Sequence, residues 1–518
     1  MKQIIPLLLA MVLVLSGCGV SYEEGPGISW EEYQQSQVQD NQDNGEDTGT
    51  NEETAYPEAF SLAYHKGHTL DPITCGEGIQ QDVSALLYEP LVELDEQLEP
   101  QPLLCESWHW DESGRVLTLV IRQGVTFSDG TTLTAADVAD TLRRAADSER
   151  YGYRLRQASS ITSNNSASQV TITLTSPNQG FPALLDIPVV KRNTAGQTVP
   201  IGTGPYVFVT GSESDSLVAN PSWWQQKELP VDTIPLVHAK DKDTAMYLFS
   251  SRRIQLLRAD PTSDLVSASG KAESTAVPTC RFQFIGFNTT EGVFASAAAR
   301  TAFSQGIQRD MVASALLSGN ALAAAFPVSP LSPLYPQDLA PEYSYESTLE
   351  DLSAAGANTG QSQELTLLVN EDNSFRVACA EFIAEGLSLL DWKITVKALP
   401  WEEYLSALAA GDFDLYYGEV RLTADWDLTS LIGTGGSLNY GGYTNTVTDG
   451  LLQSFAAAGD RSYAARQLYA HLLTTAPIAP ICFQQDVLLT HTGVASGMAP
   501  TATSVFSHLE NWTIHLQQ

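Results

Sequence analysis

Two small groups of polar residues have the types and the spacing that could support chemistry. His65 and His68 lie three residues apart, and two imidazoles at that spacing could supply half of a metal site. No second pair of His or Cys residues follows nearby, so we interpret them as loop or cleft residues and expect neither a metal nor a cofactor. Asp412 and Asp414 alternate around Phe413, which predicts a turn entering a strand rather than paired catalytic carboxylates.

The chain lacks the short motifs that most often mark a catalytic site. It contains no GxSxG elbow, no HExxH helix, no GxxxxGK(S/T) loop and no GxGxxG turn after a strand. We therefore expect that the protein is not an enzyme, with a cell-surface hydrolase as a less favoured alternative. The net charge of −34 argues against nucleic-acid binding, because such a surface repels phosphate backbones.

The segments that must position any site alternate between strand-like and helix-like patterns. Thr134, followed three residues later by Asp137, predicts the capped start of a helix over 135–145. Further helices are expected over 376–390 and 401–410, and strands over 117–122, 170–174, 206–209, 282–287, 364–369, 393–398 and 412–417. The succession from 364 to 417 is βαβαβ in form, which predicts a sheet with helices packed against it.

The first residues have the pattern of a secretory signal peptide. Lys2 supplies a positive charge, residues 4–15 are almost wholly apolar, and small residues precede Cys18. The apolar run is about a dozen residues, shorter than the roughly 20 that cross a bilayer. The ending Leu15-Ser16-Gly17-Cys18 resembles a bacterial lipobox, which implies cleavage before Cys18 and a lipid on its thiol. An ordinary signal peptide with a chance cysteine is the alternative.

The segment that follows is acidic and poor in large apolar residues, which predicts a disordered tether up to about residue 56. It contains no Lys or Arg, and its acidic residues are Glu23, Glu24, Glu31, Glu32, Asp40, Asp43, Glu46, Asp47, Glu52 and Glu53. About 460 residues remain, enough for two or three lobes. The remaining cysteines are odd in number and widely scattered, so we expect most of them to be buried and free; they are Cys75, Cys105, Cys280, Cys379 and Cys482.

An ordered series of motifs runs from about residue 60 to residue 490. It comprises Leu70-Asp71-Pro72, Leu87-Tyr88-Glu89-Pro90-Leu91-Val92, Glu106-Ser107-Trp108, residues 121–131, residues 133–138, Gly202-Thr203-Gly204-Pro205-Tyr206, residues 220–224, Gly286-Phe287-Asn288-Thr289, Arg300-Thr301-Ala302-Phe303, Trp401-Glu402-Glu403-Tyr404, residues 411–415 and Pro477-Ile478-Ala479-Pro480. In this order the motifs resemble the family 5 extracellular solute-binding proteins of the oligopeptide and dipeptide type.

Most of these motif residues have a structural interpretation. The glycines are expected to permit turns; they include Gly124, Gly130, Gly202 and Gly204. Trp108 and Trp224 are large apolar side chains, so we expect them to be core anchors rather than ligand contacts.

The resemblance implies an α/β fold of the periplasmic-binding-protein type (type II, cluster C), with three domains in two lobes, a hinge and a central ligand cleft. The expected boundaries are 1–17 for the signal peptide, 18–56 for Cys18 and the tether, 57–83, 197–277 and 483–518 for domain I, 84–196 for domain II and 278–482 for domain III. The chain should cross between lobes near Cys280 and near Cys482.

The resemblance also implies a function in import. The protein would be a lipid-anchored, extracytoplasmic monomer that captures a peptide or similar small solute by hinge closure and delivers it to an ABC permease in the membrane. A nickel chelate, haem, a sugar or a signalling peptide is the alternative ligand on the same fold.

One acidic side chain is the main candidate for ligand contact. In peptide-binding members an Asp pairs with the peptide ammonium, and the matching run here is Thr423-Ala424-Asp425-Trp426-Asp427. Asp425 is therefore the expected anchor, with Asp427 as substitute because the segment is one residue shorter than the family pattern. An acid at a helix N-terminus is the alternative interpretation of Asp425. Further candidates for the cleft lining are Tyr64, His65, Trp401, Tyr404 and Tyr440, together with Trp426 of the same run.

Overall fold

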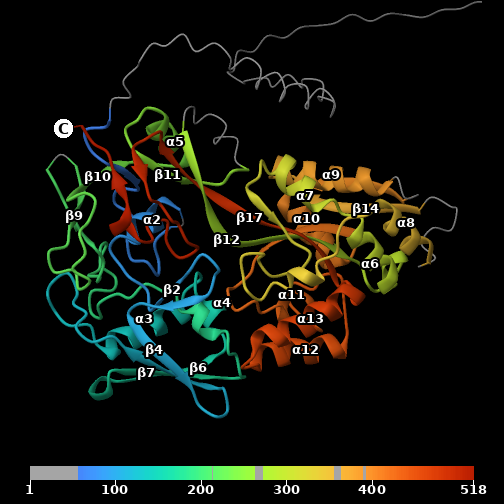
Figure 1. Ribbon diagram of the computed structural model, residues 1–518, viewed down its shortest axis with the longest axis horizontal. Helices are drawn as coiled ribbons and strands as arrows, with labels where there is room; N and C mark the ends of the chain where they lie inside the picture. Colours follow the sequence, from blue (N-terminus) through green and yellow to red (C-terminus); the bar gives the residue numbers. More distant parts are fainter. Residues whose placement is uncertain are drawn as a thin grey trace, which may run out of the picture. The chain divides into compact units, whose positions relative to one another are not determined.

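Two long antiparallel strands run side by side through the middle of the fold, β12 (Ala272–Phe287) and β17 (Ile478–His491) (Figure 1). Their register is interrupted twice, between Val277 and Arg281 and between Gln283 and Phe284. Cys280 lies within the first interruption, and Cys482 pairs with Gln283 at the second. The positions at which the sequence predicted lobe crossings therefore coincide with irregularities of this strand pair, where a strand can bend; the crossings themselves stay a prediction.

The computed structural model describes residues 56–517, apart from 77, 213, 263–271, 355–362 and 389–391. The expected signal peptide, the lipidated Cys18 and the acidic tether up to residue 55 lie outside the described residues. Within the part of the chain that is described, no helix is both long and apolar enough to cross a membrane.

The strands β12 and β17 belong to a seven-stranded mixed sheet. Its order is β11-β17-β12-β16-β14-β15, and a short strand β13 (Ala321–Ala323) also pairs with β17. The other strands are β11 (Leu256–Ala259), β14 (Gln363–Asn370), β15 (Trp392–Leu399) and β16 (Leu415–Arg421). Strand β11 pairs with residues 487–490, near the end of β17. Strand β16 pairs with residues 281–287, the last part of β12.

The βαβαβ succession predicted from the sequence is present. Helix α9 (Ser374–Ser388) connects β14 to its parallel neighbour β15, and α10 (Trp401–Ala410) connects β15 to β16, which is also parallel to β14. Gly411 ends α10 with a φ of 72°, a backbone conformation that glycine adopts without steric cost. Asp412 and Asp414 therefore lie in the turn before β16, as their spacing predicted.

A second sheet lies in the segment before β8 and has the order β4-β5-β7-β6 (Figure 1). Its strands are β4 (Cys105–Trp110), β5 (Val116–Ile121), β6 (Ala158–Asn164) and β7 (Gln169–Leu174). Strands β5 and β7 alternate strictly between buried and partly exposed residues, which confirms the predicted period. Helix α3 (Ala135–Ala146) begins with the predicted capping box between Thr134 and Asp137.

A third sheet has the order β1-β10-β9-β8 and contains β1 (Leu62–Tyr64), β8 (Tyr206–Val209), β9 (Ser216–Ala219) and β10 (Thr233–His238). Gly204 precedes β8 and donates its backbone N–H to the Leu87 carbonyl oxygen at 3.0 Å. A Cβ atom at Gly204 would lie 2.5 Å from the Leu87 carbonyl carbon, so close backbone approach, rather than a turn, requires glycine there. Gly124 and Gly130 have φ of 80° and 78°, the conformation expected of turn glycines.

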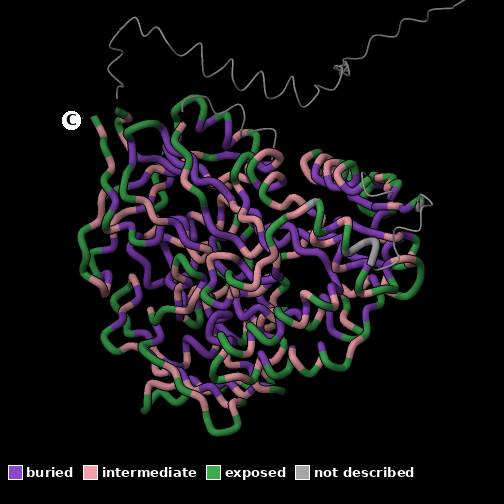
Figure 2. Tube along the Cα trace, turned by 45° about the vertical axis from the view of Figure 1, so that its right-hand side comes forward, coloured by how far each residue is buried: buried purple, intermediate pink, exposed green. Residues whose placement is uncertain are grey.

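The remaining elements are short strands and the helices that cover the sheets. They are β2 (Val92–Leu94), β3 (Pro100–Pro102), β18 (Ala495–Ser496), β19 (Thr513–Ile514), α2 (Ile79–Ser84), α4 (Gly152–Leu155), α5 (Lys242–Ser250), α6 (Ala297–Gln305), α7 (Arg309–Met311), α8 (Tyr345–Ala354), α11 (Thr429–Ile432), α12 (Thr446–Ala457) and α13 (Arg461–Thr475). Buried residues concentrate in the interior of the fold, and exposed residues follow its outer loops and helices (Figure 2).

The predictions for Cys and Trp are confirmed. The described cysteines are all free, and every one except the half-buried Cys280 is buried; they are Cys75, Cys105, Cys280, Cys379 and Cys482. Trp108 and Trp224 are partly buried and pack against the core of the second sheet. The indole N–H of Trp224 donates to the Glu89 carboxylate at 2.6 Å, so this side chain is an anchor within the fold.

Candidate functional site

A cavity of about 570 Å³ lies beside the β12–β17 pair and is lined by segments far apart in the sequence. The lining residues are Pro72, Gly78, Gln81, Asp82, Ser84, Ala85, Glu149, Arg150, Tyr151, Arg154, Asp186, Pro188, Lys242, Met246, Leu257, Arg258, Ala259, Asp260, Arg281, Arg421, Asp486, Ala502, Thr503 and Ser504. This volume is in the range of pockets that hold small solutes. The lining carries many ionisable side chains, which favours a charged or strongly polar ligand.

One wall of this cavity is an ion-pair cluster. Arg258 contacts Asp486 at 2.7 Å and Asp82 at 3.5 Å. Arg281 contacts Asp260 at 2.6 Å and also pairs with Asp486. These contacts join α2, β11, β12 and β17, so they hold one wall of the cavity in a fixed geometry.

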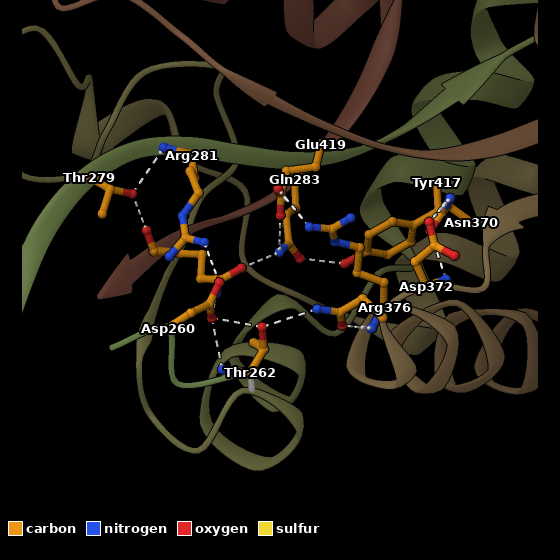
Figure 3. A network of polar contacts seen from close by, with 12 residues as sticks. Asp260, Thr262, Thr279, Arg281, Gln283, Asn370, Asp372, Arg376, Tyr417 and Glu419 are labelled. Carbon is orange, nitrogen blue, oxygen red and sulfur yellow. Dashed lines mark hydrogen bonds and ion pairs between the residues drawn. The ribbon is translucent and has the colours of Figure 1, made fainter. Parts of the chain in front are cut away.

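The cluster continues away from the cavity along β12 (Figure 3). The Gln283 amide donates to Glu419 at 3.0 Å and to the Gln484 side chain at 2.8 Å. Glu419 also pairs with Arg376 of α9 at 2.8 Å. The network therefore runs from Asp260, which follows β11, to Arg376 of α9.

Burial raises the pKa of Asp82 to about 6, and the nearby charge of Asp486 acts in the same direction while Arg258 opposes it. An unfolded Asp has a pKa near ~3.9. Because the folded pKa is the higher one, the stability associated with protonated Asp82 is fully present below about pH 4. It is lost as the pH rises through about 6.

We expect that Asp82→Asn raises the free energy of unfolding at pH 7.5 by about 1–3 kcal/mol, because a neutral amide avoids the cost of a buried carboxylate. The gain should vanish at pH 4, where Asp82 is protonated. Urea unfolding followed by Trp fluorescence at both pH values measures this. The control is Asp243→Asn at an exposed position of α5, which should change stability by less than ~0.5 kcal/mol. An equal gain at pH 4 and pH 7.5 would contradict the expectation.

Two further arginines, Arg150 and Arg154, line the same cavity. Arg154 of α4 pairs with Asp186, and its Nη2 also donates to the Leu184 carbonyl oxygen at 2.9 Å. Burial lowers the pKa of Arg154, and the positive charge of Arg421 lowers it further. Arg150 donates to the Pro72 carbonyl oxygen at 2.9 Å.

A second, apolar cavity of about 220 Å³ lies within the later part of the chain. It brings together three aromatic residues predicted from the sequence, Trp401, Tyr404 and Tyr440. The rings of Trp401 and Tyr404 stack with their centroids 6.0 Å apart, and the Tyr404 hydroxyl donates to the Tyr417 carbonyl oxygen at 2.8 Å. Such a cavity can accept an apolar or aromatic group.

The acids predicted as ligand anchors are already engaged by protein groups. Asp425 is 4% exposed and accepts hydrogen bonds from the Thr423 hydroxyl at 2.6 Å and the Asn178 amide at 2.8 Å. Asp427 pairs with Arg156 at 2.6 Å. Neither acid lines the 570 Å³ cavity.

The residue between them, Trp426, is fully buried, and its ring meets Phe483 edge-on at 5.8 Å. It has a φ of 58°, and its backbone N–H donates to the Thr423 carbonyl oxygen at 2.8 Å. The side chain of Trp426 therefore faces the core and fixes the loop that holds the two acids.

The structure does not bring Tyr64 and His65 to either cavity. Tyr64 is a core residue whose hydroxyl donates to Asp215. His65 Nδ1 lies 2.6 Å from the Ala239 carbonyl oxygen, and its ring centroid lies 5.8 Å from that of His68. Among the described residues, no group of three or more His, Cys, Asp or Glu side chains is arranged to hold a metal ion.

Sequence reasoning missed the charged residues of the larger cavity. Asp82, Arg258, Arg281 and Asp486 come from segments separated by up to several hundred residues, and none of them lies in a recognisable motif. The available signal was weak: Arg281 stands between Cys280 and Phe282, and Asp486 directly precedes the apolar run Val487-Leu488-Leu489. A charge in a buried strand generally needs a partner, but the sequence does not show which one.

Comparison with known proteins settles the family. A family model described as "Bacterial extracellular solute-binding proteins, family 5 Middle" matches residues 99–441, which is more than half of the chain. The chain belongs to family 5 of the bacterial extracellular solute-binding proteins. Members of family 5 are extracytoplasmic, and the resemblance inferred from the ordered motifs is thereby confirmed.

Individual relatives of this family 5 chain agree. The glutathione-binding protein GsiB of Escherichia coli strain K12 is 27% identical over 347 residues, which cover 64% of this chain and 67% of GsiB. The unliganded open form of the periplasmic murein tripeptide-binding protein MppA has a TM-score of 0.74 at 20% identity, covering 89% of this chain and 98% of MppA. A nickel ABC transporter structure from Bacillus halodurans has a TM-score of 0.73 at 18% identity, covering 86% and 98%. These structures share the two-lobed, mixed α/β fold of periplasmic binding proteins, so the predicted fold class is confirmed.

Proposed function

We propose that this chain is the substrate-binding lipoprotein of an ABC importer, which captures a peptide or similar small solute and delivers it to a membrane permease. The observation that carries this proposal is the 570 Å³ cavity, lined by ionisable side chains from separate segments beside the β12–β17 pair. A site assembled from separate segments can close around a ligand when those segments move together.

The hinge would lie at the two irregularities of the β12–β17 pair. We propose domain I for residues 57–83, 197–277 and 483–518, domain II for 84–196 and domain III for 278–482. Polar contacts between the proposed domains II and III would hold a closed form. They are Tyr153 with Ser430 at 2.7 Å and Arg156 with Asp427 at 2.6 Å.

A peptide is the ligand that we favour. GsiB and MppA are named for a glutathione and a murein tripeptide ligand, and both are similar to this chain. An ionic cavity beside an aromatic one suits the charged ends and a side chain of a short peptide. We propose that Trp401, Tyr404 and Tyr440 receive that side chain. Asp425 would meet the peptide ammonium only in a form in which its bond to Asn178 is broken.

The experiment begins with the lipidated full-length protein purified from its own host. Native mass spectrometry should detect a copurified peptide, and calorimetry with that peptide should give one site. Asp425→Ala should weaken peptide binding at least tenfold if Asp425 is the ammonium anchor, with Asp412→Ala, in the turn before β16, as the matched control. Hydrolysis of the peptide by the purified protein would instead support the hydrolase alternative. A copurified nickel chelate, haem or sugar would support the non-peptide alternative.

The anchor is tested in the same preparation. Full-length protein should fractionate with membranes and carry diacylglycerol mass on Cys18, whereas Cys18→Ser should appear in the soluble fraction, because the acyl chains provide the anchorage. Membrane association that persists unchanged in Cys18→Ser would contradict lipid anchoring without affecting the proposed ligand binding.

A further inference from the structure

The turn between β2 and β3 holds a leucine in a backbone conformation that leucine rarely adopts. Leu98 has a φ of 64°, and its side chain is fully buried. A Cβ atom disfavours this left-handed conformation, so the residue that takes it in the turn of a hairpin is usually glycine. A strained residue persists when the structure around it holds it in place. The burial of the Leu98 side chain is therefore the feature that calls for an explanation.

Hydrogen bonds within the turn fix the direction in which Leu98 points. The Leu98 amide donates to the Asp95 carbonyl oxygen at 3.0 Å, and the Asp95 amide donates to the Glu99 carbonyl oxygen at 3.0 Å. The Asp95 carboxylate accepts hydrogen bonds from the amides of Gln97 at 2.9 Å and of Glu99 at 3.0 Å. The hairpin therefore presents the Leu98 side chain from a turn that its own groups hold together.

The side chain of Leu98 is buried in the core of a different part of the chain from its own hairpin. Val92 of β2 belongs to the apolar core around the second sheet. Leu98 belongs instead to the apolar cluster that contains Trp426, Leu428 and Tyr469 of α13. Those three residues lie in the proposed domain III, whereas the hairpin lies in the proposed domain II. Leu98 therefore crosses the boundary between the two proposed domains.

Two further contacts cross the same boundary close to the hairpin. The Gln179 amide donates to the Ala456 carbonyl oxygen of α12 at 2.7 Å. The guanidinium of Arg461 packs so closely on Gly180 that a Cβ atom there would lie 2.8 Å from it. Burial raises the pKa of Glu99, and the charge of Arg461 opposes that rise, which places the hairpin beside α13.

This boundary is separate from both cavities. Leu98, Gln179, Gly180, Ala456 and Arg461 line neither the 570 Å³ cavity nor the apolar one. Their contacts are made by protein groups alone, so the free energy that they contribute does not depend on a ligand. Separation of the two proposed domains would expose the Leu98 side chain to water, and burial of one leucine is enough to shift an equilibrium about 10–100-fold.

We propose that residues 95–99 form a clasp, in which the Leu98 side chain holds the proposed domains II and III together, so that the closed form predominates before a ligand arrives. Ligand exchange then requires withdrawal of Leu98 from its apolar cluster. The clasp goes beyond the proposed function, in which the protein closes around its solute, because it assigns most of the closure to contacts within the chain itself.

Hydrogen exchange at the Gln179 amide, in full-length protein without ligand, tests the clasp. Leu98→Gly removes the apolar side chain but keeps the turn, because glycine adopts a positive φ without steric cost. Exchange at Gln179 should become about 10–100-fold faster, while the Asp95 amide inside the turn keeps its rate. Leu98→Met, which conserves volume, should retain most of the protection. Asn193→Gly, at an exposed position with a φ of 71°, is the matched control and should change nothing.

Unchanged exchange at Gln179 in Leu98→Gly would overturn the clasp. Equal acceleration at Gln179 and at the amides that pair β5 with β7 would also overturn it, because Leu98 would then stabilise the fold as a whole rather than the boundary. Loss of protection in Leu98→Met as large as in Leu98→Gly would show that the apolar side chain is not what holds the domains.

Alkylation of an introduced thiol measures the withdrawal directly. Iodoacetamide should modify Leu98→Cys at least about tenfold more slowly than Gln97→Cys, its exposed neighbour in the turn. Peptide mass spectrometry distinguishes these thiols from the natural cysteines. Equal rates for the two variants would show that the open form predominates. A rate for Leu98→Cys no faster than global unfolding would show that Leu98 is a fixed part of the core. Either result would overturn the clasp.

Neither measurement uses a ligand, so the two proposals fail separately. Loss of the clasp in these tests would leave the proposed solute capture standing. Failure of the chain to bind any peptide would contradict the favoured ligand and leave the clasp standing.

Discussion

Gly204→Ala is expected to leave little folded protein, with a loss in the free energy of unfolding of about 4 kcal/mol or more. A Cβ atom there would lie 2.5 Å from the Leu87 carbonyl carbon and 2.6 Å from the Leu86 carbonyl oxygen. Both atoms belong to the backbone, so no side chain can rotate away to make room. The Gly204 amide donates to the Leu87 carbonyl oxygen at 3.0 Å, and the Tyr206 amide donates to the Leu86 carbonyl oxygen at 3.1 Å. A shift of the backbone would break both hydrogen bonds.

Urea unfolding followed by Trp fluorescence measures this loss. The matched control is Gly386→Ala in α9, where an added Cβ would meet no atom within 4 Å. That variant should be more stable than wild type by about 0.5–1 kcal/mol, since alanine loses less backbone entropy in a helix. A loss below about 1 kcal/mol for Gly204→Ala would show that the neighbouring backbone moves more easily than the contacts indicate.

Trp426→Ala should cost about 3–5 kcal/mol, because it empties a fully buried site. The ring of Trp426 packs against Phe483, and the residue holds a φ of 58° between Asp425 and Asp427. Packing of a large side chain can maintain a backbone conformation that is otherwise disfavoured. Its removal should therefore also loosen the loop, including the bond from the Thr429 amide to Asp427 at 2.9 Å.

Chemical denaturation gives the loss of stability, and hydrogen exchange at the Thr429 amide reports the loop. Trp401→Ala is the control, because Trp401 is 49% exposed and should contribute less than about 1 kcal/mol. Equal destabilisation by the two substitutions would mean that burial does not distinguish these Trp residues. Unchanged exchange at Thr429 in Trp426→Ala would mean that the ring does not hold the loop.

The secondary structure that the sequence predicted well is the part set by local pattern. Helix α10 has the predicted bounds, α3 has the predicted capping box, and β8 has the predicted bounds. Among the strands that were predicted, β12 differs most in its bounds: it was expected over 282–287 and begins at Ala272. Residues 272–276 include Glu, Ser and Thr and show no apolar alternation, and they form a strand because β17, some two hundred residues later, pairs with them.

The candidate site was predicted only in part for the same reason. Trp401 and Tyr404 share a cavity wall because they lie one helical turn apart on α10, a proximity that the sequence contains. The neighbours of Arg421 are fixed instead by the β12–β16 register and by the packing of α4. No local pattern encodes either relation.

Family 5 membership, the βαβαβ order and the net charge of −34 could all be read from the sequence, because they depend on residue types and their order along the chain. The sequence also predicted Asp425 as a ligand anchor. The fold shows that this carboxylate already accepts hydrogen bonds from the side chains of Asn178 and Thr423. Likewise, only the folded chain shows that Arg258 and Arg281 have acidic partners, whereas no ion pair of Arg421 is found among the described residues. The physical reason is that a charge is satisfied by the groups within a few ångströms of it, and folding, not sequence order, selects those groups.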